Sequence, residues 1–349
     1  MYKRQGYGIF YDRYVLASLN PALQKNGTAA FEQVVSADAA TSVVHGAAGG
    51  GLLTPVAGVA PSVYRVDPNL STPYSQQSNA GVERLLARDL TASVSYLFVR
   101  GVRLSRTRNV NLLPPGPVFP AGRADARFTD IYQMENSAGS TYHGVSFALN
   151  RRMSDELAFS AGYTLSKTYD DASDFNEQPQ NPFDLRGERA VSLQHQQQRL
   201  TFNALWELPI GDDEPGKPAK DDWVTRLFGH IEVAPIVTVD SGRPVNPITG
   251  VDSNGSHAFP LSARPLAFGR NSLRTPMVAN VDFRLLKYFP FGKNARLDLV
   301  GEAFNLLNRA NVSRVNPVFG TGLMPANAFL QPISGLGARR IQFSLDFEF

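Results

Sequence analysis

The sequence predicts an all-β fold, an antiparallel transmembrane β-barrel of about ten strands. Three observations support this fold class: segments of about ten residues in which apolar and polar residues alternate, links that are alternately short and long, and 29 Gly and 24 Pro among 349 residues. Strands of soluble proteins are typically about 5 to 6 residues long, whereas about 9–11 are needed to cross a bilayer at a tilt. Strand length therefore favours a membrane barrel over a soluble sandwich.

The alternation assigns one apolar and one polar face to each predicted strand. Within residues 196–208, Phe202 and Trp206 belong to the apolar set, and Thr201 and Asn203 to the polar set. A charge facing lipid costs roughly 2–4 kcal/mol at the bilayer midplane, and the core apolar positions carry none. In chain order, the predicted strands are 2–13, 74–86, 90–104, 140–152, 157–169, 196–208, 228–241, 277–289, 295–308 and 338–349.

The links between these strands predict a single barrel domain over residues 1–349. Tight turns such as ARD, MSDE and PFGKN alternate with long stretches rich in Gly, Pro, Asn and Ser. Short turns on one side and long extracellular loops on the other are typical of outer-membrane barrels. An even strand number places both chain ends on the short-turn side. Residues 209–225 are the exception on that side, because they form a longer, charged link. The predicted extracellular loops are about 15–72, 105–139, 170–194, 242–275 and 309–337.

Composition excludes several classes of function. A net charge of +3 gives no support to nucleic-acid binding, and the absence of Cys removes disulfides and thiolate chemistry. No apolar run is long enough for a membrane helix, and the first residues lack the apolar core of a signal peptide. Five dispersed His residues show no metal-ligand spacing, and GAAGGG (46–51) lacks the Lys-Ser/Thr of a phosphate loop. The sequence therefore predicts no enzyme, no catalytic residue, no cofactor and no metal.

Aromatic residues near the ends of the apolar sets are candidates for the girdle at the membrane interface. Ordinary outward packing would give the same sequence pattern. The candidates are Tyr96, Tyr163, Trp206, Tyr288 and Phe289.

The chain ends with the strictly alternating segment RRIQFSLDFEF, whose last residue is aromatic. This ending resembles the C-terminal signal of bacterial outer-membrane proteins, which the barrel-assembly machinery reads. The resemblance assigns that role to Ile341, Phe343, Leu345, Phe347 and Phe349.

Other stretches resemble the barrel of TonB-dependent receptors, especially the Oar-like or carboxypeptidase-regulatory-like group. Such receptors have a barrel of 22 strands that surrounds an N-terminal plug, and they also carry a TonB box and a signal peptide. These residues supply no plug, no TonB box and no signal peptide, and only about ten of the strands. The resemblance implies that the chain is the C-terminal part of a 22-stranded barrel in the outer membrane of a Gram-negative cell, beginning at an internal Met. The similar stretches are GYGIFYDR (6–13), TPYSQQSNAGVER (72–84), YTLSKTYDD (163–171), SGRPVNP (241–247) and EAFNLLNRAN (302–311).

On this resemblance the chain contributes lumen wall and ligand-binding loops to a receptor for a sizeable nutrient, such as a peptide or oligosaccharide. Its expected partners are outer-membrane lipid, the barrel-assembly machinery and the nutrient; TonB would act only through a plug outside these residues. Polar residues in the loop 170–194 could contact a cation or sugar, although a solvated loop would look the same. These candidates are Asp170, Asp171, Asp174, Asn176 and Glu177.

The sequence leaves two other functions open. The first is a complete small barrel acting as a passive pore or an outer-membrane hydrolase, although no convincing Asp/His or Ser/His set is present. The second is a secreted β-sandwich with an adhesive role.

Overall fold

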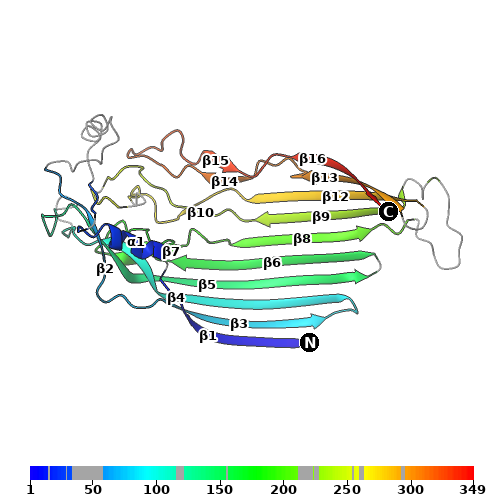
Figure 1. Ribbon diagram of the computed structural model, residues 1–349, viewed down its shortest axis with the longest axis horizontal. Coiled ribbons are helices and arrows are strands. Elements are labelled where there is room, and N and C mark those ends of the chain that lie inside the picture. Colours follow the sequence, from blue (N-terminus) through cyan, green and yellow to red (C-terminus); the bar gives the residue numbers. More distant parts are fainter. Residues whose placement is uncertain are drawn as a thin grey trace.

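Ten long antiparallel strands form one sheet in the computed structural model of the chain (Figure 1). Each strand pairs with its neighbours in chain order, which confirms the predicted antiparallel barrel fold and all ten predicted strands. The structure describes residues 1–14, 16–28, 30–33, 58–114, 122–154, 156–210, 223, 228–253, 255–258, 263–291 and 295–349. The long strands are β1 (Tyr2–Tyr11), β3 (Tyr74–Leu85), β4 (Leu90–Asn109), β5 (Ile131–Ser154), β6 (Leu157–Asp170), β8 (Gln198–Glu207), β9 (Ile231–Asp240), β12 (Val278–Phe291), β13 (Ala295–Phe304) and β16 (Arg340–Glu348).

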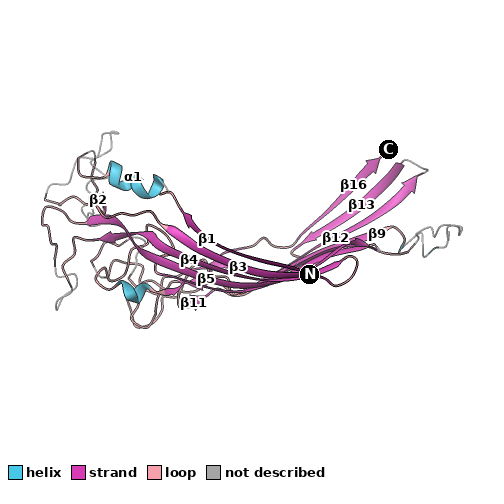
Figure 2. Cartoon of the chain, turned by 90° about the horizontal axis from the view of Figure 1, so that it is seen from below, coloured by secondary structure: helices cyan, strands magenta, loops and turns pink. Residues whose placement is uncertain are grey.

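The sheet curves and twists along its strand order from β1 to β16 (Figure 2). A β-sandwich would require two sheets stacked face to face, whereas these ten strands belong to a single sheet, so the sandwich alternative is wrong. Within the described residues β1 and β16 do not pair with each other. The described strands therefore form a curved barrel wall.

Short turns lie at one end of the sheet and long links at the other (Figure 1). The first and last residues both lie at the short-turn end, as the even strand number predicts. The predicted charged excursion at 209–225 and the glycine-rich stretch 46–51 fall outside the described residues, apart from 209, 210 and 223. We call the opposite end, which carries the links 12–73, 110–130, 171–197, 241–277 and 305–339, the long-loop end.

The strand register aligns the apolar sets of neighbouring strands on one face of the sheet. Phe202 of β8 lies opposite Val237 of β9 and Ala161 of β6. On the other face, Arg284 of β12 lies opposite Glu302 of β13. Because successive side chains of a strand point to opposite faces, this pairing extends both patterns across the sheet.

The apolar face is large and uncovered. Phe147 is 47% exposed, Leu165 45% and Trp206 43%. Soluble monomers rarely expose contiguous apolar patches of more than a few hundred Å². The solvent that suits this face is therefore lipid.

The height of the apolar band fits a bilayer. On β5, His143 and Arg151 share the apolar face and limit the band. They are eight positions apart, roughly 26 Å at about 3.3 Å per residue, close to the ~25 Å of outer-membrane barrels. Lys287 also lies on this face, near the short-turn end, and its Nζ donates a hydrogen bond to the Gly229 carbonyl oxygen at 2.8 Å. Its charge thus extends to the end of the sheet.

One of the five girdle predictions is wrong. Tyr288 lies on the polar face, opposite Asp298, and its ring packs 4.7 Å from that of His230. Adjacent residues in a strand face opposite sides, so Tyr288 and Phe289 could not both face lipid. The register places Tyr96, Tyr163, Trp206 and Phe289 on the apolar face.

Two strands are longer than the sequence predicts. β4 has 20 residues and β5 has 24, and their extensions pair with each other inside the predicted loop 105–139. In these extensions both Arg106 and Thr107 are buried, as are both Tyr132 and Gln133. Since long links cover both faces there, the alternation that marks a half-exposed strand is lost.

The predicted loop 15–72 contains a helix, α1 (Leu16–Gln24), and β2 (Val63–Val66), which pairs in parallel with residues 131–134 of β5. Among the described residues, no helix is long and apolar enough to cross a bilayer. The remaining short elements are η1 (Leu185–Glu188), β7 (Ala190–Val191), β10 (Pro244–Val245), β11 (Leu273–Arg274), β14 (Val312–Val315) and β15 (Pro332–Gly335).

Candidate functional site

Most of the buried polar side chains lie at the long-loop end. The links 110–130, 171–197 and 241–277 contact the extensions of β4 and β5 there, and two clusters of charged residues hold them in place. Buried polar groups are stable only when their hydrogen bonds are satisfied. The clusters therefore determine which loop surfaces remain free to meet a ligand.

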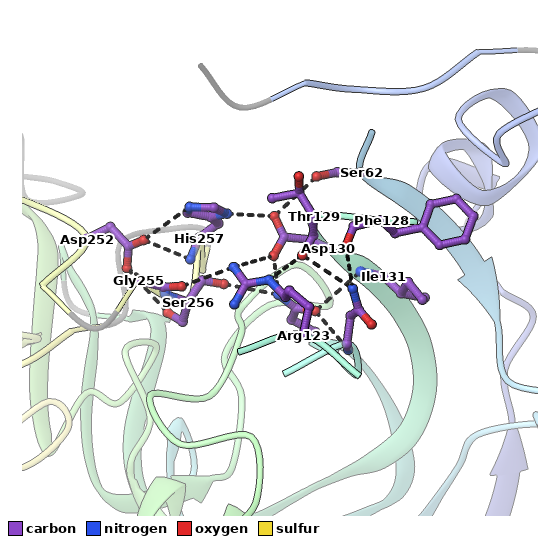
Figure 3. A network of polar contacts seen from close by, with 12 residues as sticks. Ser62, Arg123, Phe128, Thr129, Asp130, Ile131, Asp252, Gly255, Ser256 and His257 are labelled. Carbon is purple, nitrogen blue, oxygen red and sulfur yellow. Dashed lines mark hydrogen bonds and ion pairs between the residues drawn. The ribbon is translucent and has the colours of Figure 1, made fainter. Parts of the chain in front are cut away.

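The first cluster is centred on Asp130 (Figure 3). The Asp130 side chain has no exposed surface. Its carboxylate accepts hydrogen bonds from Asn109 Nδ2 at 2.6 Å and Ser62 Oγ at 3.2 Å. Arg123 Nη2 lies 3.2 Å from Oδ1, and His257 Nδ1 lies 2.7 Å from Oδ2. These partners come from four separate segments, so one carboxylate joins the links to the sheet.

His257 lies between two carboxylates. Besides the contact with Asp130, its Nε2 lies 3.8 Å from Asp252 Oδ2, and its backbone N–H donates to the same oxygen at 2.9 Å. The hydrogen bond to Asp130 raises the pKa of His257 above its ordinary value; burial opposes this shift, and the charges of Asp130 and Asp252 reinforce it against Arg123. The imidazole thus fastens the link 241–277 to the first cluster.

The second cluster is centred on Arg270, whose side chain is also fully buried. Its guanidinium donates to Asp170 Oδ1 at 2.7 Å, to Glu177 Oε1 at 2.7 Å and to Ser173 Oγ at 3.0 Å. Burial alone lowers the pKa of Arg270, but the hydrogen bonds and charges of Glu177 and Asp170 outweigh it and raise the pKa above its ordinary value. Arg270 therefore fixes the link 171–197 at two points.

The five loop residues predicted as ligand contacts divide into two groups. Asp170 and Glu177 bind Arg270, and Asp171 lies 3.2 Å from Arg189. By contrast, Asp174 and Asn176 are exposed, and within the described part of the chain Asp174 Oδ1 accepts a hydrogen bond from the local backbone N–H of Asn176 alone, at 2.8 Å. Contact between a ligand and any of the five stays a prediction.

Sequence reasoning missed the residues at the centres of both clusters. Asp130, His257 and Arg270 belong to no recognisable motif, and their partners lie up to 127 positions away along the chain. In the part of the chain that the structure describes, no group of three or more His, Asp or Glu side chains is arranged to hold a metal ion.

A cavity of about 350 Å³ opens at the long-loop ends of β1, β3 and β4. Its wall combines aromatic rings with one carboxylate and one guanidinium, the composition typical of small-molecule pockets. Tyr14 donates to the Ser71 carbonyl oxygen and lies 3.1 Å from Asn136 Oδ1, which orients its ring. The aromatic and charged lining residues are Phe10, Tyr11, Asp12, Arg13, Tyr14, Tyr74 and Phe175.

A single antiparallel sheet with a bilayer-high apolar face, short turns at one end and long loops at the other defines an outer-membrane β-barrel protein. The chain belongs to the family of outer membrane beta barrel domains, whose model matches residues 3–268 and 258–342. Its location is the outer membrane. No curated protein sequence matches the chain.

Similar solved structures are outer-membrane transporters and receptors. The outer membrane transporter YddB from Escherichia coli is 11% identical with a TM-score of 0.52, and the match covers 99% of this chain and 38% of the transporter. The ferripyoverdine receptor of the outer membrane of Pseudomonas aeruginosa is 12% identical with a TM-score of 0.47, covering 80% of this chain and 28% of the receptor. The FrpB iron transporter from Neisseria meningitidis is 9% identical with a TM-score of 0.45, and the match covers 82% of this chain and 33% of the transporter.

At these identities the likeness concerns the fold alone. The chain spans about two fifths of the length of the Escherichia coli transporter. Together with the family match, this fold confirms the resemblance to the barrel portion of TonB-dependent receptors at the level of architecture.

Proposed function

We propose that the chain forms part of the barrel wall and the ligand-binding loops of an outer-membrane receptor that imports a sizeable nutrient in a TonB-dependent manner. The observation that carries the proposal is the contrast between a lipid-facing sheet and a long-loop end, whose links are fastened by buried charges and which also contains an aromatic cavity. A passive pore needs no such fixed loop surface. A receptor does, because preorganised contacts reduce the entropy cost of binding.

In this proposal the long-loop end is extracellular and the short turns are periplasmic. The aromatic cavity and the exposed Asp174 and Asn176 then face the incoming nutrient. TonB would act through a plug encoded outside these residues, and no catalytic step is assigned to the chain.

The terminal strand supports the proposed role of an assembly signal. The apolar side chains that alternate along β16 lie on its lipid-facing side and are strongly exposed, with Phe343 at 78%. Phe349, directly after β16, is 96% exposed. The complete set is Ile341, Phe343, Leu345, Phe347 and Phe349, which we propose the barrel-assembly machinery reads.

The first test is the DNA upstream of Met1, translated in the same frame. We expect further alternating strands preceded by a plug. A stop codon directly upstream, with no such sequence, would contradict the receptor proposal and favour a small barrel.

The second test measures import without assuming the nutrient. Solutes lost from a complete medium are compared by mass spectrometry between cells with and without the gene, with and without an uncoupler. We expect depletion of a peptide or oligosaccharide that the uncoupler abolishes and that Phe10→Ala with Phe175→Ala reduces, while Phe147→Ala on the lipid face has no effect. Depletion that persists in the uncoupler indicates a passive pore.

A further inference from the structure

A basic pocket lies on the apolar side of the sheet, at the upper limit of the lipid-facing band. Arg100 of β4 follows the apolar set that ends with Phe98, and it lies directly opposite Thr141 of β5. Arg189, from the link after β6, donates through Nη2 to Thr141 Oγ1 at 3.0 Å. Arg100 and Arg189 thus both lie beside Thr141 and line the same pocket, two residues along β4 beyond Phe98.

A distortion of β4 contributes a third arginine. The register between β4 and β5 shifts after Gly101, and Arg103 has a φ of 56°, in the left-handed region that residues other than Gly rarely adopt. Asn136 Nδ2 donates to the Arg103 carbonyl oxygen at 2.7 Å and holds this conformation. Bulges of this kind redirect side chains, and here Arg103 joins Arg100 and Arg189 in lining a pocket of about 360 Å³.

The charges of the pocket are not balanced. Its one carboxylate, Asp171, lies 3.2 Å from Arg189. The side chains of Arg100 and Arg103 have no hydrogen-bond or ion-pair partner among the described residues, and both are exposed. Three guanidinium groups therefore surround a space that holds one carboxylate.

We propose that this basic pocket binds the phosphate of a phosphorylated lipid headgroup in the leaflet nearer the long loops. Guanidinium groups match the geometry of phosphate oxygens bidentately, and the pocket opens beside the level where headgroups meet the acyl chains. A soluble anion would reach a lumenal or loop-tip site more readily than one on the lipid-facing side of the wall. The inference goes beyond the proposed function and holds equally for a receptor or a pore.

The test uses the complete gene product reconstituted in nanodiscs of phosphatidylcholine with increasing fractions of phosphatidic acid. Bound phosphatidic acid is counted by native mass spectrometry after release in a neutral detergent. We expect Arg100→Gln with Arg103→Gln to weaken retention by about tenfold or more, the equivalent of losing one good charged contact. Arg100→Lys with Arg103→Lys keeps the positive charges but removes the bidentate guanidinium groups, so retention of phosphatidic acid should be intermediate.

The matched control is Arg84→Gln with Arg88→Gln, which removes the same charge near the short-turn end. It should leave retention unchanged, and a heated-versus-unheated gel shift verifies folding of every variant. Retention by the Arg100/Arg103 variant equal to that of the unaltered protein overturns the proposal. So does displacement of the lipid by millimolar inorganic phosphate, which would identify a site for a soluble anion.

Discussion

The lipid-facing sheet and the long-loop end are stabilised by opposite kinds of side chain. On the sheet, apolar residues face lipid and mostly polar residues face the other side, where Arg284 and Glu302 lie opposite each other on neighbouring strands. At the long-loop end, fully buried charges such as Arg270 and Asp130 hold chain segments that are far apart in sequence. The difference shows that strand pairing alone specifies the wall, whereas the loops need specific side-chain partners.

The largest expected effect comes from removing a central charge of the loop end. Arg270→Met leaves Asp170 and Glu177 buried without their counter-charge, and breaking a buried pair in this way costs about 3–5 kcal/mol. Hydrogen exchange of residues 170–190 should accelerate accordingly. Arg127→Met breaks only an ion pair whose arginine is 81% exposed and should leave exchange unchanged. Equal exchange in both variants would show that the second cluster does not hold the loop.

The second largest effect is expected from a charge placed on the lipid-facing side of the sheet. Phe202→Arg places a charge in the middle of the lipid-facing side of β8 and should lower the free energy of unfolding in lipid vesicles by about 2–4 kcal/mol. Asn203→Arg, one residue away on the polar face, should change it little. Guanidinium titrations followed by tryptophan fluorescence measure both variants. A similar loss for both would contradict the assignment of faces.

A smaller effect is expected where β9 passes into the loop end. A Cβ on Gly242 would overlap the Thr275 carbonyl oxygen, whereas a Cβ on Gly187 meets nothing within 4 Å. Gly242→Ala should therefore cost about 1–3 kcal/mol, as overpacking does, and Gly187→Ala should cost little. Thermal unfolding of both variants in the same detergent provides the comparison. A Gly242→Ala protein as stable as the Gly187→Ala protein would show that the backbone here adjusts freely.

The smallest effect depends on pH. Because the pKa of His257 is raised in the folded protein, its contribution to stability is fully present below the ordinary pKa and is lost as the pH rises through the folded value. Hydrogen exchange of residues 252–258, corrected for intrinsic rates, should therefore quicken on going from pH 6 to pH 8.5. His257→Gln should remove this dependence. A pH dependence that survives the substitution would assign it to another group.

The sequence predicted the sheet well because lipid on one side imposes a period of two. The ten strands and their two faces follow from that period, and the even strand number gives the side of the chain ends. The period is lost where loops cover both faces of a strand, as at Arg106 and Thr107. The prediction for Tyr288 was wrong because two adjacent residues were both assigned to the lipid-facing side. The Asp130 and Arg270 clusters could not be predicted, since single charges paired over long sequence separations leave no local pattern.

The second cluster also limits how these loops can diverge during evolution. Besides Asp170 and Glu177, Arg270 lies 4.0 Å from Glu188, and Glu188 lies 2.8 Å from a further buried arginine, Arg264. Replacing any one of these five residues therefore leaves a buried charge without its partner, unless a second residue changes with it. Exposed positions such as Asp174 and Asn176 can change without a second substitution. Divergence in ligand preference should therefore accumulate at the loop tips, one residue at a time, over an interior that can change only in coordinated steps.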